Sequence, residues 1–106
     1  MSEPSLVSKA FQTFMNDAPQ HAQAWGAMTQ ALANASALDK KTAALAYLAV
    51  LAALRLESGV PFHVKSAKQA GASRAEIISA ILIGLPTAGS VVTQVLPVAL
   101  ATYDAE

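Results

Sequence analysis

Apolar residues recur every three or four positions through most of the chain, and short breaks rich in Gly, Pro, Asn and Asp separate these stretches. This spacing is typical of one face of an α-helix. It predicts an N-terminal helix over about 5–16 and a second helix after the start signal at 17–19. A third helix, predicted over about 39–56, is apolar on nearly all sides, which places it at the centre of the structure.

Turn residues set the boundaries in the second half of the chain. Pro61 suits the first turn of a fourth helix, and Gly71 suits the position just after its end. A Ser-x-x-Glu capping box at 73–76 then starts a fifth helix. The last segment, 90–104, combines valines typical of a strand with Pro97, but a lone strand would leave its backbone groups unpaired. We therefore predict a kinked helix there, and an all-α fold of five to six helices.

The composition favours a single helical domain, residues 1–106, that associates with further copies of itself. Hydrophobic residues make up 54% of the chain and charged residues only 13%. A monomer of this size and composition would leave large apolar patches in contact with water, and such patches usually mark an interface. We therefore expect a homo-oligomer.

Charge and segment length exclude several classes of partner. Seven basic residues balance seven acidic ones, so the chain has no basic surface for nucleic acid or an anionic membrane. The longest apolar run, Ala43–Leu54, is shorter than the roughly 20 residues that cross a bilayer. The first residues lack the basic start and apolar core of a secretory signal. We expect a cytoplasmic protein that binds neither nucleic acid nor membrane.

The chain contains no cysteine, which excludes disulfides, thiolate metal sites and thiol redox chemistry. Its two histidines, His21 and His63, lie far apart in sequence, and neither occurs in a His-x-x-x-His or Glu-x-x-His spacing. We therefore expect no metal and no cofactor.

Four short motifs occur in order along the chain: Leu-Asp-x-Lys-Thr at 38–42, His63, Ala-Gly-Ala-Ser-x-x-Glu-Ile at 70–77, and Gly-Leu-Pro-Thr-Ala at 84–88. Together they resemble the carboxymuconolactone decarboxylase and AhpD-like alkylhydroperoxidase superfamily. The resemblance covers about residues 22–103, with the N-terminal helix outside it. It implies an AhpD-like helical fold and a trimer or hexamer.

The resemblance also implies where catalytic groups would lie. In the hydroperoxidase branch a Cys-x-x-Cys pair occupies the positions of Leu56 and Gly59, and a glutamate occupies that of Ala44. Peroxide reduction needs a thiolate and a resolving thiol, so this chain is not a thiol peroxidase. The decarboxylase branch does not depend on the thiols, and the segment at 84–88 looks like its Gly-x-Pro segment. A decarboxylase-type lyase therefore remains as an enzymatic interpretation.

His63 is the main candidate catalytic residue. A helical wheel places it on the same, inward side as Ser66 and Ala67, with the nearby lysines on the other side. As an acid/base it would transfer protons at carbon, with Tyr47 or Ser66 as an orienting hydrogen-bond donor. Equally, the His63 ring and the Tyr47 hydroxyl could each simply hydrogen-bond a backbone carbonyl.

Two function classes follow. The first is a thiol-independent decarboxylase or isomerase that acts on a small carboxylic or lactone compound through His63, for which a cavity at the ring would be needed. The second is a non-catalytic family member, an oligomeric or small-ligand-binding module, in which neighbouring apolar side chains pack around the ring. The sequence favours the second class, because every other acid, base and nucleophile at the family's catalytic positions is missing.

Overall fold

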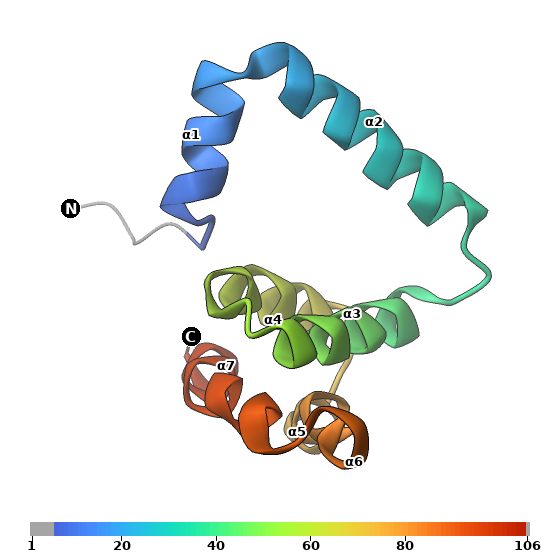
Figure 1. Ribbon diagram of the computed structural model, residues 1–106. Coiled ribbons are helices and arrows are strands. Elements are labelled where there is room, and N and C mark those ends of the chain that lie inside the picture. The colour runs from blue at the N-terminus through green and yellow to red at the C-terminus, as the bar shows by residue number, and fades with distance from the viewer. Residues whose placement is uncertain (1–5, 106) are drawn as a thin grey trace. The chain divides into compact units, whose positions relative to one another are not determined.

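The computed structural model describes residues 6–105, and helices dominate this part of the chain (Figure 1). It contains six α-helices of nine residues or more: α1 (Lys9–Asp17), α2 (Pro19–Ala35), α3 (Lys40–Leu54), α4 (Val60–Gln69), α5 (Arg74–Leu82) and α7 (Leu96–Asp104). Three shorter elements are α6 (Leu85–Ala88) and the 3-10 helices η1 (Glu57–Gly59) and η2 (Ser90–Val95). Residues 6–105 contain no strand, so the predicted all-α fold is confirmed.

The chain divides into two compact units, one ending at Asp39 and the other beginning at Lys40. The second unit holds every buried hydrophobic side chain of the described residues: Leu48, Leu51, Ala52, Val60, Val64, Ala67, Ala72, Ile77, Ile81, Val92, Val95 and Ala99. Within this unit α3 packs against α4, α5 and η2, and α7 packs against α4 and α5. The prediction of a central apolar helix is thereby confirmed.

The first unit is a pair of neighbouring helices, α1 and α2 (Figure 1). Aromatic rings join them: the Phe11 and Trp25 centroids lie 5.0 Å apart, edge to face. Neither helix has a fully buried residue. The helix predicted over about 5–16 begins at Lys9, after Ser8 accepts a hydrogen bond from the Phe11 N–H, and the predicted start at residue 5 lies outside the described residues.

Local signals in the sequence set the ends of α4 and α5 as predicted. The Ser73 hydroxyl accepts a hydrogen bond from the Glu76 N–H at 3.0 Å, and the Glu76 carboxylate accepts one from the Ser73 N–H at 2.9 Å. This reciprocal pair is the capping box. Pro61 lies in the first turn of α4, where it removes no intrahelical hydrogen bond.

α3 and α4 end in the same hydrogen-bonded motif with different residues at the left-handed position. After α4, the Ala72 N–H donates to the Ala67 carbonyl at 3.0 Å and Gly71 has φ of 101°. After α3, the Leu56 N–H donates to the Leu51 carbonyl at 3.0 Å, but the left-handed residue is Arg55, with φ of 59°. Both are Schellman motifs. Only the motif after α3 places a residue with a side chain, Arg55, in the left-handed conformation, which is strained for residues other than glycine.

These two positions predict stability changes of opposite sign. Gly71→Ala should lower the free energy of unfolding by about 1–2 kcal/mol, because alanine is strained at positive φ. Arg55→Gly should raise it by about 0.5–1 kcal/mol, since the same strain is removed while the unfolded chain gains some freedom. Urea unfolding of the two variants and the wild type at equal protein concentration measures both changes. The same sign for both variants would contradict this interpretation.

The segment predicted as a kinked helix, 90–104, changes from 3-10 to α geometry between Val95 and Leu96. Pro97 lies in the first turn of α7 and so does not interrupt a helix. The segment therefore changes from 3-10 to α geometry before Pro97, where the sequence predicted a kinked helix.

Side chains from α4 and α5 fix the end of α7. The Tyr103 hydroxyl donates to the Ala72 carbonyl at 2.9 Å, and Lys68 Nζ donates to the Tyr103 carbonyl at 2.6 Å. Arg74 binds both carboxylate oxygens of Asp104, at 2.9 and 3.1 Å. Lys68 is thus engaged with α7, on a different side of α4 from the side that meets α3.

Candidate functional site

His63 lies in the first turns of α4, on the side of that helix that meets α3. Its ring centroid is 4.4 Å from that of Tyr47 on α3 and 5.2 Å from that of its neighbour Phe62. The side chain is half-buried, while both aromatic neighbours are exposed. His63 is therefore a surface group at the α3–α4 junction, in contact with two aromatic rings.

The His63 ring makes no hydrogen bond to any described residue. No buried side-chain nitrogen or oxygen of residues 6–105 lacks a hydrogen-bond partner, so both ring nitrogens must reach solvent. Partial burial lowers the pKa of His63 below its ordinary value of 6.5. The imidazole is therefore mostly neutral at pH 7.

The structure brings only one of the predicted orienting groups to His63. Tyr47 touches it ring against ring, and within residues 6–105 the Tyr47 hydroxyl has no hydrogen-bond partner. Ser66 lies one turn further along α4, where it is exposed, and it makes no hydrogen bond to the His63 ring. The described residues show no hydrogen bond from either hydroxyl to the imidazole, and the predicted roles of Tyr47 and Ser66 stay predictions.

The positions that the resemblance associates with thiol chemistry surround this turn. Leu56 precedes η1 and is 48% exposed. Gly59 ends η1, and Ala44 packs at the edge of the core on α3. The two positions of the Cys-x-x-Cys pair thus lie just before α4, and here they carry no reactive group.

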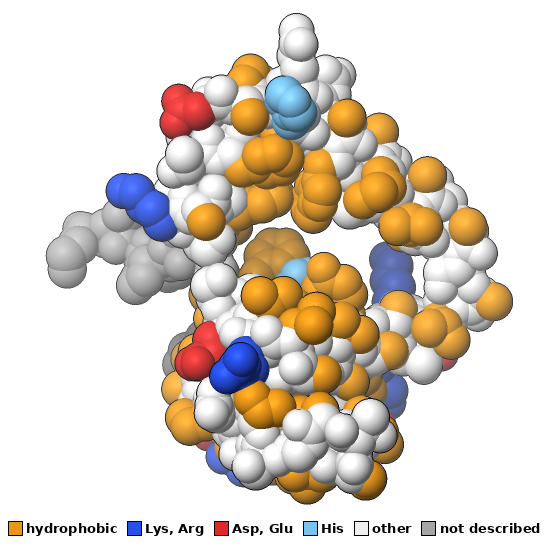
Figure 2. All heavy atoms as spheres, in the orientation of Figure 1, with side chains coloured by type: hydrophobic (Ala, Val, Ile, Leu, Met, Phe, Trp, Pro, Cys, Tyr) orange, Lys and Arg blue, Asp and Glu red, His pale blue; other side chains and the backbone are white. Residues whose placement is uncertain are grey.

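Exposed apolar side chains extend from His63 along α3. Val50 and Leu54 follow Tyr47 at helical spacing and are 52% and 61% exposed, so one side of this helix is uncovered. With Phe62 and His63 these residues form a surface that we call the α3–α4 face, and Figure 2 shows hydrophobic side chains gathered over these helices. The predicted central helix α3 is thus covered by the other elements of the second unit on only part of its surface.

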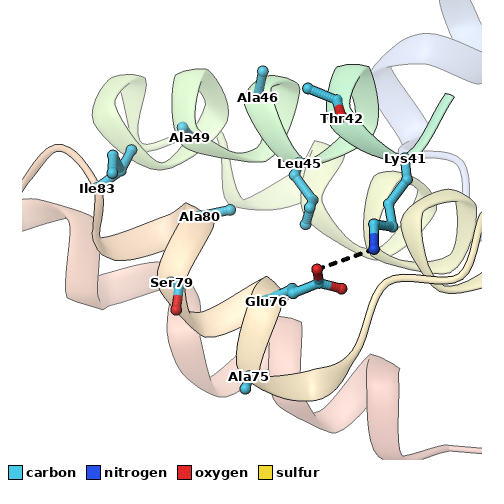
Figure 3. Close-up of a pocket in the computed structure, with 10 residues that line it drawn as sticks. All are labelled: Lys41, Thr42, Leu45, Ala46, Ala49, Ala75, Glu76, Ser79, Ala80 and Ile83. Atoms are coloured by element: carbon cyan, nitrogen blue, oxygen red, sulfur yellow. Dashed lines mark ion pairs between the residues drawn. The ribbon is translucent and has the colours of Figure 1, made fainter. Parts of the chain in front are cut away.

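A shallow groove runs between α3 and α5, away from the His63 ring (Figure 3). Small side chains form its walls, among them Ala46, Ala49 and Ala80. At one end Lys41 Nζ lies 3.0 Å from a carboxylate oxygen of Glu76. The Ser73 N–H and then Lys41 lower the pKa of Glu76. Because the two charges pair with each other, the groove suits an apolar group better than an ion.

Sequence reasoning missed this groove. The alanines of α3 indicated close approach of neighbouring helices, but small residues on both α3 and α5 leave space at the surface instead. Alanine at 46 and 49 on α3, and at 75 and 80 on α5, is the signal that was available.

The described residues also bear on metals and membranes. In the part from 6 to 105, no three His, Asp or Glu side chains come together as metal ligands would. Over the same range, every helix is too short or too polar to cross a bilayer.

Comparison with known proteins identifies the family. The model of the carboxymuconolactone decarboxylase family matches residues 19–101. The chain belongs to this family. A search of curated proteins and one of solved structures found no match. The family match runs from the start of α2 into α7. It therefore includes His63, the α3–α4 face and the groove between α3 and α5.

As a cysteine-free member of the carboxymuconolactone decarboxylase family, the protein cannot reduce peroxides with its own thiols. Membership therefore confirms the predicted resemblance but does not by itself assign a reaction. His63, the main candidate from the resemblance, is a half-buried imidazole in contact with two aromatic rings, and its catalytic role stays a prediction.

His63 gives the protein a predicted pH dependence. Its pKa is lowered in the folded state, so between pH 6.5 and that lower value the unfolded chain binds a proton more readily. The free energy of unfolding should therefore fall as the pH is lowered through this window. Below the window it should change no further through His63, and above the window His63 should have no effect on it. Glu76 and Asp104, whose pKa values are also lowered, titrate in the carboxyl range, below the window.

Urea unfolding at about pH 7.5 and about pH 5.5 separates this contribution, because the interval spans the ordinary histidine range. Wild type should lose stability between the two values, and His63→Gln should lose less. His21→Gln is the matched control and should behave as wild type. An equal loss in wild type and His63→Gln would show that another group is responsible.

Proposed function

We propose that the protein is a non-catalytic member of the carboxymuconolactone decarboxylase family that acts as a self-associating module. The observation that carries this proposal is the α3–α4 face, an exposed apolar surface with His63 at its edge. Such a surface is rare on a small monomer and typical of a contact between proteins.

The surroundings of His63 also argue against proton transfer. General acid–base catalysis needs a second group that orients the imidazole or stabilises the developing charge. Partial burial lowers the pKa of His63, and neither the Lys41–Glu76 nor the Arg74–Asp104 ion pair involves its ring. Its neighbours Tyr47 and Phe62 offer ring faces and edges. This environment suits packing better than catalysis.

Light scattering coupled to size exclusion tests the proposal. At micromolar concentration we expect a homo-oligomer, and the family resemblance points to a trimer or hexamer. A monodisperse monomer of 106 residues would contradict the proposal.

A thiol-independent decarboxylase or isomerase is the second candidate, favoured by an imidazole that is neutral at pH 7 and reaches solvent. Here His63 would exchange a proton with a small carboxylic or lactone substrate. Absorbance assays with small unsaturated lactone acids test it, using His63→Gln and, as control, His21→Gln. We expect no turnover. Turnover lost only in His63→Gln would support the enzyme instead.

The small ligand expected from the sequence has a candidate place in the α3–α5 groove, whose alanine walls suit an apolar group. Melting curves with small uncharged apolar compounds, such as aliphatic alcohols, test this role. A rise in melting temperature that Ala49→Phe removes would support binding there, because the larger side chain fills the groove. An equal rise in both proteins would place the ligand elsewhere.

A further inference from the structure

The middle and the end of α7 are held by different kinds of contact. Ala99, in the middle, is fully buried in the core. Residues 102–105, which we call the α7 end, have exposed polar contacts: Lys68 Nζ donates to the Tyr103 carbonyl at 2.6 Å and to the Ala105 carbonyl at 3.5 Å. Exposed hydrogen bonds with few buried neighbours mark the segments of a protein that open first. The α7 end is therefore the part of this helix expected to open before the core.

The ion pair at the α7 end joins two charges that both lie at the unfavourable end of a helix. Arg74 is the first residue of α5, and Asp104 is the last residue of α7. The helix dipole favours an anion in the first turn and a cation in the last turn, so each charge alone would destabilise its own helix. The Arg74 guanidinium binds the Asp104 carboxylate through two hydrogen bonds, of 2.9 and 3.1 Å. Each charge is thus compensated only while the other is bound to it.

The connection between α4 and α5 supplies the other partners of the α7 end. The Ala72 carbonyl accepts a hydrogen bond from the Tyr103 hydroxyl at 2.9 Å. Lys68 Nζ lies 4.7 Å from the centre of the same ring, which packs at the edge of the core. Opening of the α7 end would therefore free a lysine, an arginine and a backbone carbonyl together, all at this one connection.

We propose that the α7 end is a latch, which opens when salt screens the Arg74–Asp104 pair while the core of the second unit stays folded. The two side chains of the pair are 49% and 52% exposed, so dissolved ions reach both. Every contact of the latch lies within the second unit. The latch therefore goes beyond the proposed self-association and does not depend on it.

Hydrogen exchange of the whole chain, read by mass spectrometry, tests the latch. Fragments that cover the α7 end are compared with fragments of α3, at one protein concentration and at about 0.01 M and about 1 M sodium chloride. The screening length falls from about 30 Å to about 3 Å between these two conditions. We expect the α7 end to exchange several-fold faster at high salt, and α3 to exchange no faster. Equal acceleration of both would show that the α7 end opens only with the core, and no acceleration would show that the pair does not hold it. Either result overturns the latch.

Asp104→Asn and Arg74→Gln each remove one partner of the pair. In both variants the α7 end should exchange at low salt about as fast as it does in wild type at high salt, and it should no longer respond to salt. Asp17→Asn is the matched control, because Asp17 ends α1 as Asp104 ends α7, and it should leave the exchange of α7 unchanged. A salt response retained in full by Asp104→Asn or by Arg74→Gln would assign it to other charges and overturn the latch.

Discussion

Val50→Glu is expected to yield a folded monomer. Val50 is 52% exposed on α3 and lies outside the core, so a glutamate there can remain in water in the isolated chain. Glutamate also has a higher helix propensity than valine. In an assembled contact the same carboxylate would be buried without a partner, at a cost of about 3–5 kcal/mol. Self-association should therefore weaken by roughly 100- to 4,000-fold.

Light scattering over a range of protein concentrations measures this loss, and far-ultraviolet circular dichroism shows whether the helices remain. Ala101→Glu is the matched control, because it adds the same charge at an exposed helical position on α7. It should assemble as wild type does. A Val50→Glu protein with the mass of the wild-type oligomer would show that the α3–α4 face is not the contact.

The second large effect is expected in the core. Leu48 lies on α3 with no exposed surface, among the buried side chains of the second unit. Leu48→Ala removes these contacts and leaves a cavity, which should lower the free energy of unfolding by about 2–5 kcal/mol. A domain of this size has only about 5–15 kcal/mol in total, so the melting temperature should fall by many degrees.

Leu54→Ala is the matched control on the same helix, because Leu54 is 61% exposed. In the isolated chain this substitution should cost well under 1 kcal/mol. The two variants should also differ in their dependence on protein concentration. Leu48→Ala destabilises the chain itself at every concentration, whereas Leu54→Ala acts through assembly and should matter only where wild type is assembled. Equal losses for the two leucines would contradict this division between core and contact.

Signals that act within a few residues could be predicted from the sequence. The capping box at Ser73 and Glu76 and the left-handed Gly71 depend on neighbours along the chain, and both occur as expected. Arg55 has the same left-handed role after α3, but an arginine there carries no signal, since glycine is the residue that marks such a position. The backbone hydrogen bonds that close the motif, from the Arg55 and Leu56 N–H groups to the Ala52 and Leu51 carbonyls, accompany this conformation.

Surfaces and contacts between elements could not be predicted in the same way. A helix as uniformly apolar as α3 has little periodicity, so the sequence could not show that the second unit leaves Tyr47, Val50 and Leu54 uncovered. His63 and Tyr47 were both recognised as candidates, yet their ring contact joins two helices and depends on how α3 and α4 pack. Pairing between helices is a property of the folded core, not of spacing along the chain.

The division of the chain at Asp39 and Lys40 also has a kinetic consequence. Every buried side chain of residues 6–105 lies in the second unit, so we expect this unit to fold cooperatively, while α1 and α2 have no buried side chain to protect their backbone amides. We expect amide hydrogens of α1 and α2 to exchange with deuterated solvent early in dilute protein and much later in concentrated protein. Those of the central helix should exchange late at both concentrations. The order of exchange would then separate the step that folds a chain from the step that joins it to its neighbours.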